Sequence, residues 1–268
     1  MRRPHADAIP STSWSTLMDL TTWPLIGPLV QLGAAGLHEL VALLEPLAGT
    51  GAAALAVALI TLVVRALLIP LDVRMVRAEG ARRRLAPALA ALRTRWKKKP
   101  EELQRRTMEL YRDEGVSPVA GFGSMLAQAP IVSLLYLVLA SPAIAGQPNP
   151  LRAEELLGVG FGEALGLAVV TGGAGAIVLT ASVIVLLTVS GLLQRRAMRM
   201  LQQGLPTPEI PAAVAPMLGI LPFIAIIPAL IVPFGAAIYL AISSLWSAIE
   251  RPVLRRVLWS EAEWTPTA

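Results

Sequence analysis

Apolar residues in this chain are gathered into long runs, and five of these runs are long enough to cross a lipid bilayer. A helix needs about 20 predominantly apolar residues to span the hydrocarbon core. The runs lie at 51–71, 122–140, 166–193, 212–230 and 232–250. This pattern predicts an all-α integral membrane protein with five transmembrane helices.

Two of the runs carry signals of irregularity. The third contains Gly172, Gly173 and Gly175, which predicts that its helix tilts or bends. Only the segment Pro228–Pro233 separates the last two runs, which is typical of a tight hairpin.

An earlier apolar stretch, 24–47, is interrupted by proline, glycine, histidine and glutamate, while its leucines recur at roughly helical spacing. This composition predicts an amphipathic helix lying on the outer face of the membrane. The alternative is a sixth span, which would move the N-terminus to the inside.

Cations are concentrated between the apolar runs, and their distribution predicts which side of the membrane each connecting segment occupies. Nineteen of the 23 Lys and Arg fall in the segments 72–124, 194–211 and 251–256. With five spans, all three segments lie on one side of the membrane if the N-terminus is outside. Because cytoplasmic loops carry the excess of Lys and Arg, we expect the N-terminus outside and the C-terminus in the cytoplasm.

The most basic segment, 72–117, is predicted to be a cytoplasmic helical hairpin. Its first helix is expected over 72–96 and its second over 101–114, with the turn KKKP between them. Pro100 suits the first position of the second helix, where two glutamates follow at the positive end of the helix dipole. Gly115 is well placed to end that helix.

Composition removes several classes of function. The chain is 55% hydrophobic and only 15% charged, which excludes a disordered protein. It has no cysteine, and its two histidines are isolated, so we expect neither a metal site nor a cofactor. The glycine cluster at 172–175 lacks a phosphate-binding lysine and indicates helix packing. The first residues have no apolar run typical of a signal peptide.

One residue stands out as a candidate for function. Arg65 is the only ionisable group in the run GAAALAVALITLVVRALLIPL, residues 51–71. Insertion scales place an arginine at mid-bilayer at a cost of roughly 2.5 to 3.5 kcal/mol, and such residues usually face a protein interior or a wet cavity. The alternative is that Arg65 extends along the helix to the cytoplasmic headgroups.

The chain resembles the YidC family of membrane protein insertases. The resemblance lies in TLVVRALLIPL (61–71), in the hairpin LAPALAALRTRWKKKPEELQRRTMELYRDEGVSPVAG (85–121) and in MLAQAPIVSLLY (125–136). A weaker likeness continues in VPFGAAIYLAISSLW (232–246). The family fold implies a five-helix core around a hydrophilic groove, which is open to cytoplasm and lipid and closed on the outside.

The resemblance also implies a set of site residues. The groove arginine corresponds to Arg65, with Thr61 one turn earlier, Gln128 in the second span and Tyr239 in the last. Structural alternatives remain: Thr61 can bond to its own helix backbone, and Gln128 can bond between helices. Apolar faces that contact cargo are expected at Met125, Leu126, Ile131, Leu218 and Phe223.

The hairpin cations form a candidate surface for lipid headgroups, ribosomal RNA or a targeting receptor. The alternative is that they serve only to set the orientation of the chain in the membrane. They are Arg82, Arg83, Arg84, Arg93, Arg95, Lys97, Lys98, Lys99, Arg105 and Arg106.

Departures from the family pattern are local. The hairpin is followed by Ser117-Pro118 instead of Asn-Pro, and by Ala120-Gly121-Phe122 instead of Gly-Gly-Cys. The C-terminal segment 251–268 is short and basic, so we do not expect an extended ribosome-binding tail.

The leading interpretation is a non-enzymatic insertase and chaperone in the bacterial cell membrane, with residues 1–23 outside, a core over 24–250 and the tail inside. Nascent membrane proteins are its expected cargo, and the ribosome, a targeting receptor, the Sec channel and anionic lipid are further candidate partners. The alternative is a small-solute transporter or its membrane subunit, which would more often show internal repeats. An enzyme is third, because no constellation of catalytic residues lies in a span.

Overall fold

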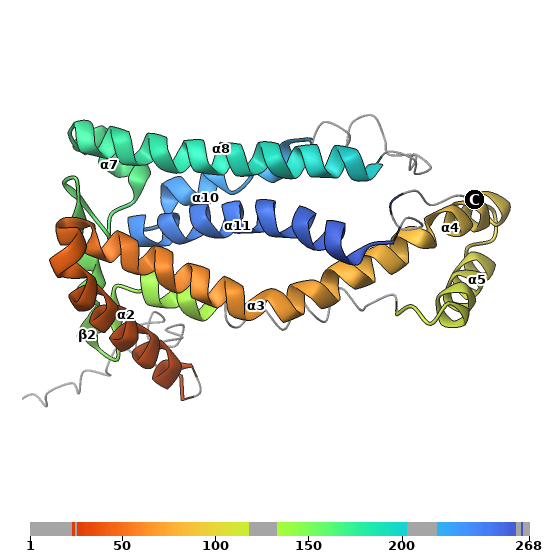
Figure 1. The fold of residues 1–268 in the computed structure, drawn as a ribbon, viewed down its shortest axis with the longest axis horizontal. Coiled ribbons are helices and arrows are strands. Elements are labelled where there is room, and N and C mark those ends of the chain that lie inside the picture. Colours follow the sequence, from red (N-terminus) through yellow and green to blue (C-terminus); the bar gives the residue numbers. More distant parts are fainter. Residues whose placement is uncertain (1–22, 25, 118–132, 203–218, 261–263, 265–268) are drawn as a thin grey trace, which may run out of the picture.

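Three long helices form the body of the protein in the computed structural model (Figure 1). They are α3 (Ala52–Arg84), α8 (Ala174–Gln202) and α11 (Phe234–Leu258). The structure describes residues 23–24, 26–117, 133–202, 219–260 and 264. Helix α11 lies in the middle and packs against α3 on one side and α8 on the other. Small residues of α11, Ala236, Ala237, Ala241 and Ala248, are buried, which lets the neighbouring helices approach closely.

The three long helices all run in the same direction. The loop over 143–165 contacts the start of α8, where Leu157 lies against Gly175, and the start of α11, where Glu163 accepts a hydrogen bond from the backbone of Phe234. It also contacts the turn at 49–51, just before α3. At the other end, Arg83 of α3 donates to Leu201 of α8, and Arg255 of α11 pairs with Glu79 of α3. These three helices fall in the stretches predicted as the first, third and fifth spans.

The remaining expected spans are described only in part. The second, 122–140, is helical over 133–140, and its earlier residues lie outside the described part. The described part of the fourth, 212–230, is a helical pair at 219–220 followed by the 3₁₀ turn η4 (Leu221–Phe223) and the short helix α10 (Ile226–Ile231). A single helix is therefore the wrong description here, because Pro222 and Pro228 each remove a backbone donor.

The third expected span is broken in two. Its start forms the short helix α7 (Leu165–Thr171), which ends before α8 begins at Ala174. The glycines signalled a bend, and the structure places a complete break there. The expected turn Pro228–Pro233 is also shorter than predicted, because Pro228 lies inside α10 and only residues 232–233 separate α10 from α11.

Helix α2 (Gly27–Ala48) covers the amphipathic stretch, contacts α3, and extends away from the start of α3 at an angle (Figure 1). A 3₁₀ turn, η2 (Gly49–Gly51), joins the two helices. One face of α2 is buried, and large leucines remain exposed on the rest. The buried residues are Val30, Ala34, Leu37, Val41 and Leu44.

The basic hairpin projects from the far end of α3. The structure corrects the first helix expected over 72–96: α3 continues without a break to Arg84, and the hairpin itself consists of α4 (Ala86–Arg95) and α5 (Pro100–Asp113). Pro100 opens α5 as predicted, and Gly115 has a left-handed φ of 63° just beyond its end.

The loop over 143–165 closes the end opposite the hairpin. It consists of two short antiparallel pairs, β1 (Ala143–Ile144) with β2 (Gln147–Pro148) and β3 (Glu155–Leu156) with β4 (Val159–Gly160), and the 3₁₀ turn η3 (Pro150–Ala153) lies between them. Side chains from the loop enter the main core, where Phe161 packs edge-on against Phe234 with ring centroids 5.1 Å apart. Buried Asn149 holds the loop by donating to the carbonyls of Val138 and Ser141.

Large apolar side chains cover the outside of the bundle. Within the described residues, Gly27–Arg84 and Ala174–Leu201 are two helical stretches that are long and apolar enough to cross a membrane. Many of their leucines and valines are exposed, among them Leu32, Leu67 and Val185, at 72%, 72% and 58%. So much exposed apolar surface would be costly in water, and its location on these two stretches agrees with contact to lipid.

The approach of the loop to α8 gives a test of this closure. A Cβ at Gly175 would collide with the backbone oxygen of Leu157, whereas a Cβ at Gly173 would meet open space. Gly175→Ala should therefore lower the stability by about 1–3 kcal/mol, as overpacking does. Gly173→Ala should cost less than about 1 kcal/mol. Thermal unfolding of the purified protein measures both, and equal effects would show that the loop does not press on α8.

Candidate functional site

The candidate arginine lies between the two helices that pack most closely. Arg65 is half-buried on α3, and its Nε donates to the Oγ of Ser243 on α11 across 3.4 Å. Tyr239 lies one turn before Ser243, is buried, and is within hydrogen-bonding reach of it. The arginine therefore faces the bundle interior, and its partner Ser243 was absent from the sequence-based set.

Thr61 bonds to the backbone of its own helix, which was the structural alternative to a role in a groove. It is completely buried one turn before Arg65, and its hydroxyl donates to the carbonyl of Val57 in the same helix, at 2.6 Å. Its side chain thus satisfies its own helix backbone. It still contributes a small polar group to the face that α3 presents to α11.

Of the other residues expected to line the groove or contact cargo, only Phe223 lies in the described part of the chain. It lies in η4, half-buried, and its ring packs so closely on Gly191 of α8 that a Cβ there would be 2.7 Å from a ring carbon. The remaining five lie outside the described residues: Gln128, Met125, Leu126, Ile131 and Leu218.

Two carboxylates continue the polar row toward the basic end. Asp72 on α3 is buried, with 4% of its surface exposed. Glu250 on α11 is half-buried and accepts a hydrogen bond from the indole nitrogen of Trp246. A repeated spacing could have revealed them: polar residues occur at i, i+4 and i+11 on both helices, at Thr61, Arg65 and Asp72 and at Tyr239, Ser243 and Glu250.

A second cluster joins the ends of the long helices. Arg255, 8% exposed, makes a two-pronged ion pair with Glu79, its shortest distance being 2.8 Å. Trp259 packs beneath it and donates its indole hydrogen to the carbonyl of Val76 at 2.9 Å. Arg83 also lies over this indole ring and donates to the carbonyls of Leu201 and Trp264. These contacts hold α3, α8 and the chain after α11 together.

Burial separates the hairpin cations into two kinds. Arg83 is 8% exposed and fully engaged in this cluster, so it is not part of an open binding surface. Arg84, Arg93, Arg95 and Lys97–Lys99 are exposed, and Arg82 is half-buried.

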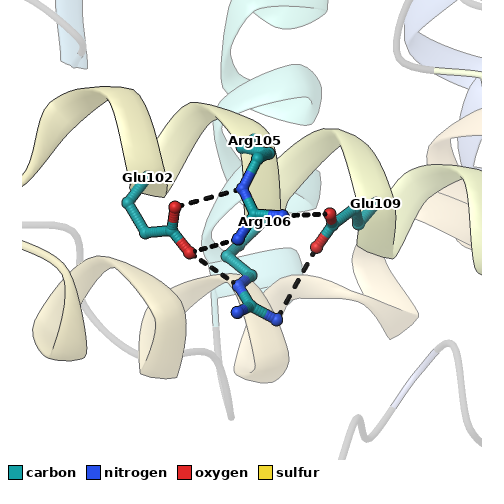
Figure 2. A network of polar contacts seen from close by, with 4 residues as sticks. All are labelled: Glu102, Arg105, Arg106 and Glu109. Carbon is teal, nitrogen blue, oxygen red and sulfur yellow. Dashed lines mark hydrogen bonds and ion pairs between the residues drawn. The ribbon is translucent and has the colours of Figure 1, made fainter.

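Charged side chains of α5 are partly balanced within the helix. Arg105 and Arg106 pair with Glu102 and Glu109, as Figure 2 shows. Hydrogen bonds from the two arginines lower the pKa of Glu102 from 4.5 to about 2, so this carboxylate keeps its charge down to about pH 2. These exposed pairs stabilise the helix only modestly and are weakened by salt.

The tip of the hairpin gathers three cations around one aromatic ring. Arg95, Lys99 and Arg106 lie 5.7, 5.9 and 5.9 Å from the ring centre of Trp96. Cation–π attraction of this kind favours a compact tip. The lysines at 97 and 98 extend from it, exposed to solvent.

These features define a helical membrane protein with a polar, arginine-containing seam inside it and a basic hairpin at one end. A family model described as "60Kd inner membrane protein" matches residues 45–261. The chain belongs to this family, which includes the YidC-type insertases.

Curated relatives carry the same assignment. A protein of Clostridium perfringens named "Membrane protein insertase YidC" is 35% identical over 103 residues, which are 38% of this chain and 43% of that protein. Proteins of the same name from Burkholderia mallei and Burkholderia pseudomallei are 32% identical over 102 residues, 38% of this chain and 18% of theirs. The matched stretch thus spans less than half the length of these relatives.

Proposed function

We propose that this chain is a membrane protein insertase that helps newly made membrane proteins to enter the bilayer and fold. The single observation that supports it best is Arg65, which lies half-buried between α3 and α11 with a polar partner, Ser243. Family membership and the names of the relatives support the same function.

The mechanism we propose is electrostatic and hydrophobic, without a covalent step. The guanidinium of Arg65 attracts acidic groups in a short translocated tail of the cargo, where low dielectric strengthens the attraction. Polar residues beside it, including Ser243 and Tyr239, let the tail enter partway, in a groove that opens toward the cytoplasm and lipid. The apolar segment of the cargo meanwhile slides along the exposed apolar surface of the bundle.

We infer that the hairpin end is cytoplasmic and that the chain resides in the bacterial cell membrane. The basic ends of α3, α8 and α11 and the hairpin lie on one side of the bundle, and the closed loop over 143–165 lies on the other. The positive-inside rule assigns the basic side to the cytoplasm.

This orientation predicts which positions a membrane-impermeant thiol reagent reaches. Because the chain has no cysteine, single cysteines introduced at Lys98, Arg199 and Arg256 should react only from the cytoplasmic side. A cysteine at Gln147, exposed in β2, should react only from outside. Labelling of the Lys98 position from outside intact cells would reverse the orientation and remove the support for an inward-opening groove.

The exposed cations of the hairpin are proposed to dock reversibly on a polyanion, either anionic lipid or a ribosome that delivers cargo. Since such binding releases counterions, association of the full-length protein should weaken steeply between about 50 and 200 mM salt. Replacing Lys97, Lys98 and Lys99 by glutamine should weaken binding and flatten the salt dependence. Co-sedimentation with ribosomes, and separately with anionic vesicles, measures this. Binding that ignores salt would leave the hairpin with its orientation role alone.

Arg65→Ala provides the central test of the mechanism. It should leave the fold intact, because it removes an expensive intramembrane charge, and should impair insertion of cargo whose translocated tail is acidic. Arg65→Lys should retain much activity if a point charge suffices and lose it if the planar guanidinium is required. Neutralising the acidic residues of the cargo should shrink the difference between wild type and Arg65→Ala.

A matched control for this test is Arg74→Ala, which removes an exposed arginine from the same helix. It should insert every cargo at the wild-type rate in a proteoliposome insertion assay. If Arg65→Ala also inserted acidic-tailed cargo at that rate, attraction by Arg65 would be the wrong mechanism, and the residue would be a structural partner of Ser243.

A further inference from the structure

The polar seam between α3 and α11 contains acids as well as an arginine. Each helix places polar residues at i, i+4 and i+11, and every pair of corresponding residues is separated by the same 178 positions. The pairs are Thr61 with Tyr239, Arg65 with Ser243, and Asp72 with Glu250.

Contacts along the two helices show that this correspondence is spatial. Arg65 meets Ser243 at a separation of 178 residues, Glu79 meets Arg255 at 176, and Val76 meets Trp259 at 183. The separations at Arg65 and Glu79 differ by only two residues although these residues lie four turns apart on α3, so the two helices are parallel and in register. Trp259 lies beyond the last residue of α11 and does not share this register. Asp72 therefore lies level with Glu250, two turns or about 10 Å further along the helices than the level of Arg65 and Ser243.

Both carboxylates lie at least partly buried within the bundle. Asp72 is buried on the face of α3 that also buries Thr61, Leu68 and Val76. One oxygen of Glu250 is held by the indole of Trp246, and the other is buried without a hydrogen-bond partner among the described residues. Asp72, Arg65 and the neighbouring Arg251 all lie close enough to Glu250 to interact with it electrostatically.

We propose that Asp72 and Glu250 form a counter-charge pair that partly offsets Arg65 and thereby sets how many acidic residues a cargo tail needs for capture. This inference rests on the proposed insertase function. It assigns to the two acids a role in specificity: they are positioning residues, which act on cargo through the arginine.

The physical reason is competition for one cation in a medium of low dielectric. Two carboxylates about 10 Å from a guanidinium lower the potential that it presents, by an amount that matters at an effective dielectric near 20. A cargo carboxylate must then compete with Asp72 and Glu250 for the positive charge of Arg65. A tail with several acids does so easily, whereas a weakly acidic tail does not. The pair also limits capture of other anions, such as lipid phosphates, by an uncompensated arginine.

The test uses the full-length protein in proteoliposomes and a single-span cargo whose translocated tail carries zero, one, two or three aspartates. Glu250→Gln should raise insertion of the one-aspartate cargo by about five- to tenfold, toward the level of the two-aspartate cargo. It should change the three-aspartate cargo little. Asp72→Asn should act in the same direction, and Glu250→Asp, which keeps the charge, should behave as wild type.

The decisive comparison is made in the Arg65→Ala background, where Glu250→Gln should have no charge-dependent effect. Glu114→Gln is the matched control, since it removes an exposed acid from the hairpin side and should not alter the dependence on tail charge. A change by the same factor for all four cargoes, or an equal effect with and without Arg65, would show that Glu250 acts only on the fold. If Glu250→Gln and Asp72→Asn both left the dependence of insertion on tail charge unchanged, the inference would be overturned and the proposed function would still stand. If Arg65→Ala itself left the dependence on tail charge intact, the proposed function would be the part that fails.

Discussion

An arginine inside a membrane-spanning helix must find polar partners within the protein, and this requirement explains the closest helix pairing in the structure. Arg65 can donate a hydrogen bond to Ser243 only because α3 and α11 run parallel and in register. The same register brings Glu79 to Arg255, and Trp259, just beyond the end of α11, donates to the carbonyl of Val76. Alanines along α11 permit the close approach, so apolar packing and polar contacts depend on one alignment.

The two ends of this pair are closed by different means. At one end the loop over 143–165 inserts Phe161 against Phe234 and hydrogen-bonds to the backbone at the start of α11. At the other end, arginines lie at the last turns of α3 and α11, where the negative ends of the helix dipoles favour them. The chain thus places a packed apolar seal at one end and a cationic, hydrogen-bonded junction at the other, with the polar seam between them.

The sequence predicted those features that depend on local pattern. Run lengths located α3, α8 and α11, the KKKP turn and Pro100 located the hairpin, and the lone charge at Arg65 indicated an inward-facing residue. The break at residues 172–173 and the irregular segment before α11 were harder, because a proline or glycine signals interruption without fixing its geometry. Tertiary partners were the least accessible: Ser243 is an ordinary serine until the register of two helices 178 residues apart is known.

The distribution of Lys and Arg predicts the orientation of the chain in the membrane, but it does not identify which of these residues can bind a partner. Arg83 and Arg255 belong to the basic segments, but both are buried and hold the helix ends around Trp259. Arg105 and Arg106 are exposed, but two glutamates of the same helix balance them. Arg84 and Arg93 are exposed on the hairpin, and at its tip Lys98 is exposed beside a tryptophan surrounded by three other cations. The hairpin lies at one end of the bundle, away from Arg65, so docking and cargo capture can be changed independently (Figure 1).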